Sequence, residues 1–146
     1  MILEGKYSIE TSREKLWMFI IDPNKIGKCL PDLKNLSVES ENKFTAVIAV
    51  GVGFMKADFK FKIEIVGKEP ASRVQLRAVG TGSGSSINLD LAIELKEIPE
   101  GSELDYRADV KVSGMIASLG QLVIKDTAEK TVKGIFDCIR SSCSEP

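Results

Sequence analysis

The chain contains no histidine among its 146 residues. Histidine is the commonest general base in enzymes and the commonest transition-metal ligand, so its absence removes the usual centre of a catalytic triad or a zinc site. The three cysteines, Cys29, Cys138 and Cys143, are odd in number and lack the paired spacing of metal ligands. We therefore expect no metal site and no disulfide framework, and we interpret the cysteines as ordinary packing or surface residues.

Long apolar runs and blocks of like charge are also missing. No stretch reaches the about 18 apolar residues that a membrane span needs. The first seven residues include Glu4 and Lys6, which argues against a signal peptide. The 20 basic and 21 acidic residues are interspersed and give a formal net charge of −1, so nothing favours nucleic-acid binding. The length suits a single domain, residues 1–146, and we expect that domain in the cytoplasm.

The N-terminal part of the chain predicts one strand followed by two short helices. The segment 2–9 alternates in the manner of a strand. Thr11 and Glu14 have the spacing of a capping box, which makes Thr11 the expected N-cap of the first helix. Asp22 and Pro23 end that helix and begin a second one, because proline is tolerated at the first helical position and aspartate caps it.

Six further segments predict strands with one apolar and one charged face. The clearest is 102–113, in which Leu104, Tyr106 and Ala108 alternate with charged residues. Such strands form an antiparallel sheet that is wet on one face and covered on the other. The connections are short and turn-like, so strands adjacent in sequence are expected to pair as hairpins. The predicted spans are 34–40, 43–52, 57–67, 72–81, 86–97 and 102–113.

From about Met115 to Arg140 the apolar residues recur every three or four positions, which predicts one continuous helix. Because secondary structure packs in layers, this helix should cover the apolar face of the sheet. Its stripe includes Gly120 and Ala128, which are small for a core helix. Such residues either leave space between helix and sheet or let the two backbones approach closely, and both interpretations stay open at this stage.

The order and content of these segments resemble the CoxG family of carbon monoxide dehydrogenase proteins, within the START-like superfamily. The resemblance implies the helix-grip fold, an α+β domain in which a seven-stranded antiparallel sheet wraps around a long C-terminal helix. Two short helices lie between its first and second strands, and a hydrophobic cavity lies between sheet and long helix. The matching stretches cover essentially the whole chain and are Ser12 to Trp17 with Asp22-Pro23, Cys29-Leu30-Pro31, Val50 to Gly53, Gly80 to Gly84, and Gly114 to Gly120.

The same resemblance implies association with a molybdenum hydroxylase such as carbon monoxide dehydrogenase, in membrane attachment or in passing electrons to quinone. We therefore interpret the chain as a non-enzymatic protein that binds a hydrophobic small molecule, quinone-like or lipid-like, as an accessory or electron-transfer partner of such an enzyme. Peripheral contact with the inner face of the membrane fits this role, and no cofactor is expected. Two alternatives stay open: an assembly factor that binds a protein without any ligand, and a START-like hydrolase or cyclase.

The candidate ligand-binding residues face the predicted space between sheet and helix or lie at its mouth. Tyr106 and Trp17 either offer a hydrogen bond inside that space or are ordinary buried aromatics. The strand carboxylates fall on the charged face, so we find no inward pair for acid–base chemistry and expect no catalytic or metal-binding residue. The candidates are Trp17, Phe54, Met55, Phe59, Phe61, Leu89, Leu91, Tyr106, Ala108, Gly120, Ile124 and Ala128.

An apolar rim is a further hypothesis. Phe54 and Met55 sit in a glycine-flanked turn, although loop tips are normally polar. At about 100° per residue, Leu119, Leu122 and Val123 fall opposite the main helical stripe. Either neighbouring elements cover these side chains, or they join Phe54, Met55 and Ile116 as an exposed rim that docks on a membrane or on the partner enzyme.

Overall fold

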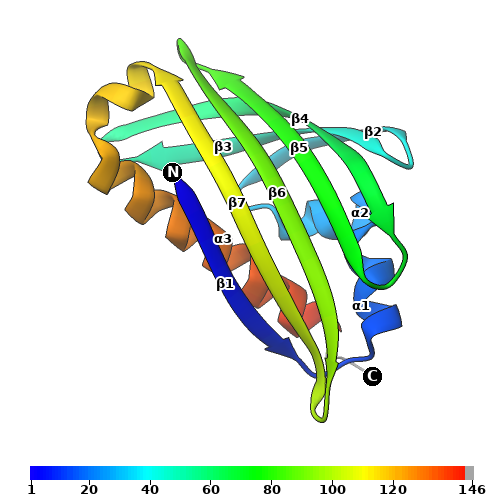
Figure 1. The fold of residues 1–146 in the computed structure, drawn as a ribbon. Coiled ribbons are helices and arrows are strands. Elements are labelled where there is room, and N and C mark those ends of the chain that lie inside the picture. Colours follow the sequence, from blue (N-terminus) through cyan, green and yellow to red (C-terminus); the bar gives the residue numbers. More distant parts are fainter. Residues whose placement is uncertain (144–146) are drawn as a thin grey trace.

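A meander of hairpins builds a seven-stranded antiparallel sheet that bends around one long helix (Figure 1). The structure is a computed structural model that describes residues 1–143. The sheet order is β1-β7-β6-β5-β4-β3-β2, so the first strand pairs with the last and every other neighbour is a hairpin partner. The strands are β1 (Ile2–Ile9), β2 (Leu33–Ser40), β3 (Lys43–Val52), β4 (Met55–Glu69), β5 (Arg73–Gly82), β6 (Ser85–Ile98) and β7 (Gly101–Gly114).

The helical elements lie between β1 and β2 and after β7. They are α1 (Arg13–Ile20), α2 (Pro23–Ile26), the 3₁₀ helices η1 (Gly27–Cys29) and η2 (Met115–Leu119), and α3 (Gln121–Cys143). The predicted arrangement of an α+β domain with seven antiparallel strands, two short N-terminal helices and a long C-terminal helix is therefore confirmed.

The two short helices begin with side-chain caps, one of them at a different residue from the predicted one. The hydroxyl of Ser12, not of Thr11, accepts a hydrogen bond from the backbone N–H of Lys15 at 3.2 Å. The prediction of Thr11 was wrong because its N–H donates to the carbonyl of Ile9 at 2.9 Å, in a tight turn that leaves β1 before the helix can start. Asp22 caps α2 as predicted and accepts from the N–H of Asn24.

The prediction of one continuous helix from about Met115 was also wrong. The chain forms the separate 3₁₀ helix η2, and α3 begins only at Gln121. Gly120 lies between them with a φ of +95°, a backbone conformation that no α-helix contains and that glycine adopts at little cost. The N–H of Ile116 donates to Ser85 Oγ at 2.9 Å, which holds η2 against the start of β6. Gly120 therefore marks a bend and not a position on the helical stripe.

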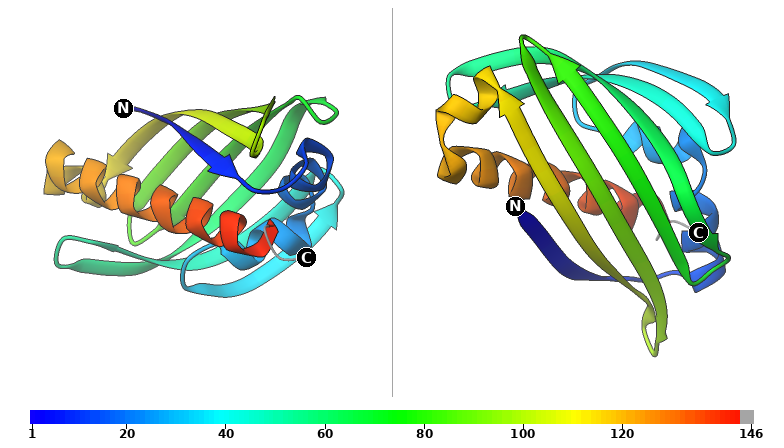
Figure 2. Two further views of the ribbon diagram at one scale, coloured as in Figure 1. Left: turned by 90° about the horizontal axis from the view of Figure 1, so that it is seen from below. Right: turned by 45° about the horizontal axis from the view of Figure 1, so that its top comes forward.

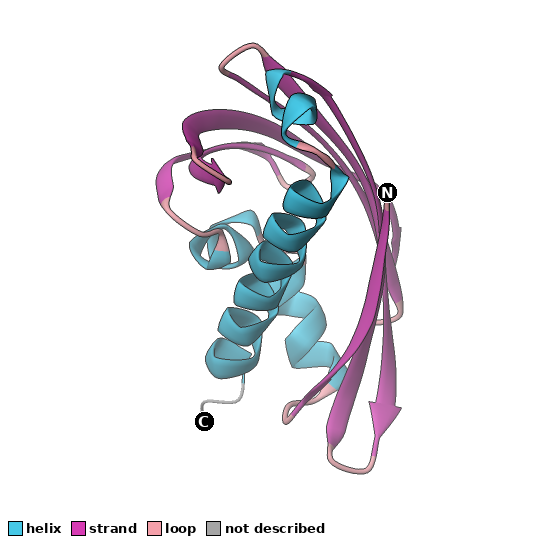
Figure 3. Ribbon diagram, turned by 90° about the vertical axis from the view of Figure 1, so that its left-hand side faces the viewer, coloured by secondary structure: helices cyan, strands magenta, loops and turns pink. Residues whose placement is uncertain are grey.

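The helix α3 lies across the concave side of the bent sheet (Figures 2 and 3). Its buried side chains are Phe136 and Ile139, both in its C-terminal third. The preceding turns carry Ile124, Ala128, Val132 and Ile135, which are all only half-buried. The helix is thus packed tightly at one end and loosely along the rest of its length.

A disulfide joins Cys29 in η1 to Cys138 in α3, with a Cα–Cα distance of 5.5 Å. The expectation that the cysteines are unpaired was wrong, because the fold brings together two residues separated by 109 positions in the sequence. Cys143 keeps a free thiol, and burial raises its pKa above the ordinary value. The bond ties the tightly packed end of α3 to the helices that follow β1.

Candidate functional site

The buried apolar residues include one large cluster and one small satellite cluster, which is a common arrangement in a single domain. The smaller one, called here the apical cluster, consists of the buried residues Val52, Phe59 and Ile116. The larger one, called the basal cluster, lies around α1 and the C-terminal end of α3. It consists of Ile9, Leu16, Trp17, Ile20, Cys29, Ile65, Val74, Ile93, Leu95, Leu104, Phe136 and Ile139.

Between the two clusters, the inner face of the sheet carries the small residue Ala78 among larger apolar residues that stay partly exposed. Strand pairing sets Ile63 beside Ala78, Ala78 beside Leu89, and Leu89 beside Val110 in one row across the sheet. Ala78 is buried, whereas its larger neighbours in this row are half-buried although they lie on the covered face. The larger side chains of Ile63, Leu89 and Val110 therefore stay partly exposed on the covered face.

The helix α3 passes over this part of the sheet (Figures 2 and 3). Ile124 packs against the apical cluster and Val132 against the basal cluster. Ala128 lies between them on the same stripe, is half-buried, and belongs to neither cluster. We use the name inner chamber for the region between Ala128 on α3 and the row of Ile63, Leu89 and Val110 on the sheet.

The predicted site residues divide between the chamber, the core and the surface. Phe61, Leu89, Leu91 and Tyr106 are half-buried on the inner face of the sheet, and Ile124 and Ala128 are half-buried on α3. Phe59, Ala108 and Trp17 are buried, with Trp17 inside the basal cluster. Gly120 is exposed at the bend before α3, so it does not face the chamber as expected. Met55 is half-buried and Phe54 is exposed.

Three stacked aromatic rings line the basal end of the chamber, and two of them were missed in the sequence. Phe136 stacks on Tyr106 at a centroid distance of 5.0 Å and on Tyr7 at 4.7 Å. Gly5 makes room for this arrangement, since a Cβ there would lie 2.9 Å from Cε1 of Tyr106. The position of Tyr7 on the apolar parity of β1, together with Leu3 and Ile9, was a signal that could have found it.

The phenol of Tyr106 is the polar group that we single out at this end of the chamber. Burial, and to a smaller extent the neighbouring Tyr7 and Glu129, raise the pKa of Tyr106 above its ordinary value. Tyr106 therefore stays protonated near neutral pH, and its O–H can donate a hydrogen bond. On the outer face, Asp90 forms an ion pair with Arg77, and Asp105 forms one with Lys96.

The predicted rim is exposed in part. Of its predicted members, Phe54 is 94%, Leu122 86% and Val123 37% exposed, whereas Met55 is half-buried. Ile116 and Leu119 were expected in the rim, but Ile116 is buried in the apical cluster and Leu119 packs against it. Both residues belong to η2, which a hydrogen bond from the Ile116 N–H to Ser85 Oγ holds against the start of β6. From here on, the name rim is used for Phe54, Leu122 and Val123.

A groove of about 840 Å³ opens next to the rim, between α3 and the edge of β3. Strand β2 covers that edge only as far as Ile48, and the last backbone bond joins the N–H of Ala49 to the carbonyl of Asp32. Beyond this point β3 has no neighbour on that side within residues 1–143. The groove is lined by Pro31, Asp32, Ile48, Ala49, Val50, Gly51, Gly53, Lys56, Leu122, Val123, Asp126, Thr127, Lys130, Thr131 and Gly134. It links the rim with inward-facing residues of the sheet.

Residues 1–143 contain neither a cluster of metal ligands nor a membrane-spanning helix. Histidine, cysteine, aspartate and glutamate side chains do not gather there in any group of three that could hold a metal ion. None of the helices in this part of the chain combines the length and the apolar character that crossing a membrane requires.

The chain is similar to known proteins in sequence pattern and in fold. The family model that describes CoxG of carbon monoxide dehydrogenase matches residues 5–144. A conserved protein from Geobacillus kaustophilus has a TM-score of 0.91 at 23% identity, with 99% of this chain and 95% of that chain covered. A START superfamily protein from Mycobacterium smegmatis has a TM-score of 0.74 at 11% identity, with 97% and 96% covered.

A more distant neighbour is the Zhui aromatase/cyclase from Streptomyces sp. R1128, with a TM-score of 0.73 at 9% identity and with 98% of this chain and 93% of that chain covered. No curated protein matches the chain in sequence. At these identities the solved structures share the fold, and fold alone does not determine function.

Proposed function

Because the chain belongs to the CoxG family of carbon monoxide dehydrogenase proteins, we propose that it binds a hydrophobic small molecule in the inner chamber between the sheet and α3. The partly exposed apolar side chains on the covered face of the sheet are the observation that carries this proposal. Apolar side chains on a covered face that remain partly exposed gain stability when a ligand removes them from water, at roughly 25 cal/mol per Å². A quinone-like or lipid-like molecule fits a lining of aliphatic and aromatic groups.

A quinone-like head group has additional support from the basal end of the chamber. The stack of Tyr7, Phe136 and Tyr106 offers flat apolar surfaces, and the Tyr106 hydroxyl offers a proton to a carbonyl oxygen. Apolar pockets commonly orient a ligand through one such polar group. The family implies association with carbon monoxide dehydrogenase, so we propose that the bound molecule serves a molybdenum hydroxylase of that type as an accessory or electron carrier.

The two alternatives are supported less well. A protein that acts only as an assembly factor has no need of partly exposed apolar side chains on the covered face of its sheet. A hydrolase or cyclase needs a nucleophile or a charged residue that faces the chamber. The described positions around the chamber carry aliphatic and aromatic residues, and the thiol of Cys143 has a raised pKa, which disfavours its nucleophilic thiolate. We therefore propose a binding protein and not an enzyme.

Native mass spectrometry after gentle purification tests this function. We expect a fraction of the protein to carry a non-covalent mass that organic extraction removes and that elutes as an apolar compound. The extracted protein should then bind a hydrophobic fluorescent probe such as anilinonaphthalene sulfonate with saturation. If the native mass equals that of the chain alone and the extracted protein shows no saturable probe binding, the proposed function is wrong.

The rim gives a second prediction, on ligand exchange. The double variant Phe54→Ser/Leu122→Ser should slow the transfer of an apolar probe from vesicles to the protein about tenfold, because exposed apolar patches mark contact sites. Thermal stability should be unchanged, since both side chains are almost fully exposed. Stopped-flow fluorescence measures the transfer rate, and calorimetry measures the melting temperature.

Met18→Ser/Val66→Ser is the matched control, because it removes two exposed apolar side chains from other elements of the fold. The control should exchange the probe at the wild-type rate. Equal slowing in both double variants would contradict a specific role of the rim, and so would a wild-type rate in Phe54→Ser/Leu122→Ser.

A further inference from the structure

One region of the outer face of the sheet carries basic side chains without acidic partners. Strand pairing sets Lys62 beside Val79, Val79 beside Asn88, and Asn88 beside Lys111. The next row contains Lys60, which is followed across the sheet by hydroxyl-bearing residues, namely Thr81, Ser86 and Ser113. We call Lys60, Lys62 and Lys111 the basic patch. All three are exposed, and none forms an ion pair with any residue of the described chain.

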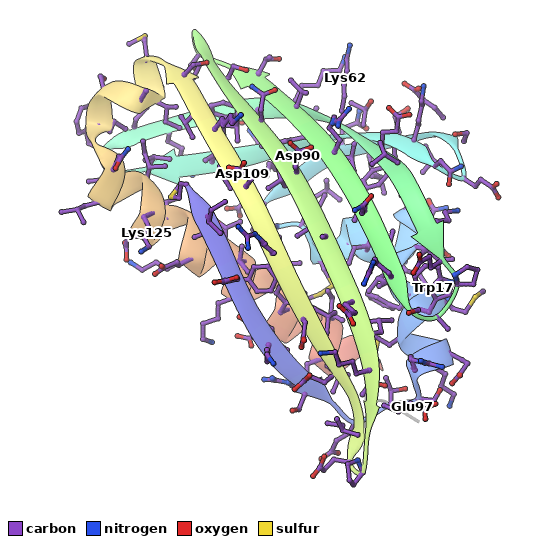
Figure 4. All side chains as sticks on the ribbon, viewed as in Figure 1. Trp17, Lys62, Asp90, Glu97, Asp109 and Lys125 are labelled. Atoms are coloured by element: carbon purple, nitrogen blue, oxygen red, sulfur yellow. A yellow bond between two sulfur atoms is a disulfide. The ribbon has the colours of Figure 1, made fainter. Side chains whose placement is uncertain are left out.

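The two rows of the patch contain no acidic residue, whereas the rows on either side contain several, most of them in ion pairs. In the row on one side of the patch, Nε of Arg77 lies 3.1 Å from Oδ1 of Asp90, and Oδ1 of Asp109 lies 3.8 Å from the amino group of Met1. On the other side of the patch, Nζ of Lys34 lies 2.8 Å from Oδ1 of Asp58. Figure 4 shows Lys62 projecting away from the sheet above Asp90 and Asp109. With a formal charge of −1 for the whole chain, the patch is a local excess and not the result of a basic protein.

We propose that the basic patch docks a carboxylate-rich surface of a protein partner. Charge complementarity of this kind speeds association and fixes orientation. The hydroxyl and amide groups between the lysines can donate further hydrogen bonds to carboxylates. Because the lysines lie on hydrogen-bonded strands in the middle of the sheet, their spacing is fixed before the partner arrives, which lowers the entropic cost of binding.

A membrane surface fits this face less well than a protein does. Stable attachment through basic residues requires a second, apolar anchor. The rim residues Phe54 and Leu122 belong to the β3–β4 turn and to α3, and the exposed apolar residue within the two rows is Val79 at 38%. The sheet also bends around α3, so its outer face is convex and meets a flat bilayer over a narrow strip only (Figure 3). Docking through this face leaves the rim and the groove free for ligand exchange.

The inference rests on the proposed function for the identity of the partner, which is the molybdenum hydroxylase of the same organism. Carbodiimide cross-linking of the two purified proteins, followed by peptide mass spectrometry, tests the surface directly. We expect cross-links from Lys60, Lys62 or Lys111 to aspartate or glutamate residues of the enzyme. The triple variant Lys60→Glu/Lys62→Glu/Lys111→Glu should weaken binding about tenfold or more in interferometry, and salt should weaken the wild-type complex.

The control is Lys15→Glu/Lys28→Glu/Lys68→Glu, which changes the net charge equally at exposed positions outside the patch. Weaker binding confined to the patch variant supports the proposal. Cross-links confined to other lysines, equal loss in both triple variants, or no complex at all would overturn it. Patch-dependent binding to phosphatidylglycerol vesicles without any enzyme binding would also overturn it. Native mass spectrometry of the same samples shows separately whether the ligand is still retained, so failure here is distinct from failure of the proposed function.

Discussion

Removal of the Cys29–Cys138 disulfide is expected to lower the free energy of unfolding by about 4 kcal/mol. The bond joins residues separated by 109 positions, so it restricts most of the unfolded chain, and the loss of chain entropy grows with the length of the closed loop. It also holds the end of α3 that carries the buried residues Phe136 and Ile139. Guanidinium unfolding of the double variant Cys29→Ala/Cys138→Ala, compared with the wild-type protein, measures the effect.

Cys143→Ala is the control, because this variant removes a thiol close to the bond and leaves the bond intact. It should unfold within about 1 kcal/mol of the wild type, as substitutions outside the tightly packed core usually do. The wild-type protein treated with a strong reductant should match the double variant. If the double variant and the wild type have equal unfolding midpoints and slopes, the disulfide does not stabilise the fold.

The fold was predictable from the sequence because the faces of the strands differ so clearly in polarity. In β7, Leu104, Tyr106 and Ala108 alternate with charged residues, and strand pairing preserves that alternation across the sheet. A register shift of one residue would expose the whole apolar set, so the pattern also fixes how the strands align. Because the turns between β2 and β7 are short, strands that are adjacent in the sequence pair with each other, which gives a meander.

The errors arose where one residue or a distant contact overrides a periodic pattern. The stripe from Met115 to Arg140 is helical in period, but the positive φ of Gly120 interrupts the helix, and periodicity does not report φ. The pairing of Cys29 with Cys138 depends on tertiary distance alone. The choice of Ser12 over Thr11 as N-cap depends on a turn at the end of β1.

The candidate site was predictable only in part, for a related reason. Alternation identifies which side chains face inward, such as Leu89 and Leu91, but not how far the covering helix stands from them. Ala128 packs against neither core cluster, and this depends on the position of α3 above the sheet, which alternation does not report. The same is true of Phe136, which completes the stack with Tyr7 and Tyr106 from a position beside the main helical stripe.

Replacement of Ala128 by phenylalanine is expected to abolish most ligand binding and leave the fold intact. The new ring would extend from α3 into the inner chamber, between Ile124 and Val132, and occupy the volume that we assign to the ligand. Overpacking a filled core costs about 1–3 kcal/mol, but filling an existing space need not. We expect the affinity for a hydrophobic probe to fall about tenfold or more, a change of about 1.4 kcal/mol for each factor of ten.

Ala92→Phe provides a matched control for Ala128→Phe, because it makes the same chemical change on the opposite side of the sheet. Ala92 lies in a depression of about 520 Å³ on the outer face, among charged residues such as Arg107 and Glu94, so a ring there has room but cannot reach the chamber. The control should bind the probe like the wild type.

Fluorescence titration and guanidinium unfolding of both variants separate the outcomes. If Ala128→Phe lowers the free energy of unfolding by several kcal/mol, or binds the probe as tightly as Ala92→Phe does, then no ligand-sized space lies beneath α3 and the chamber assignment is wrong.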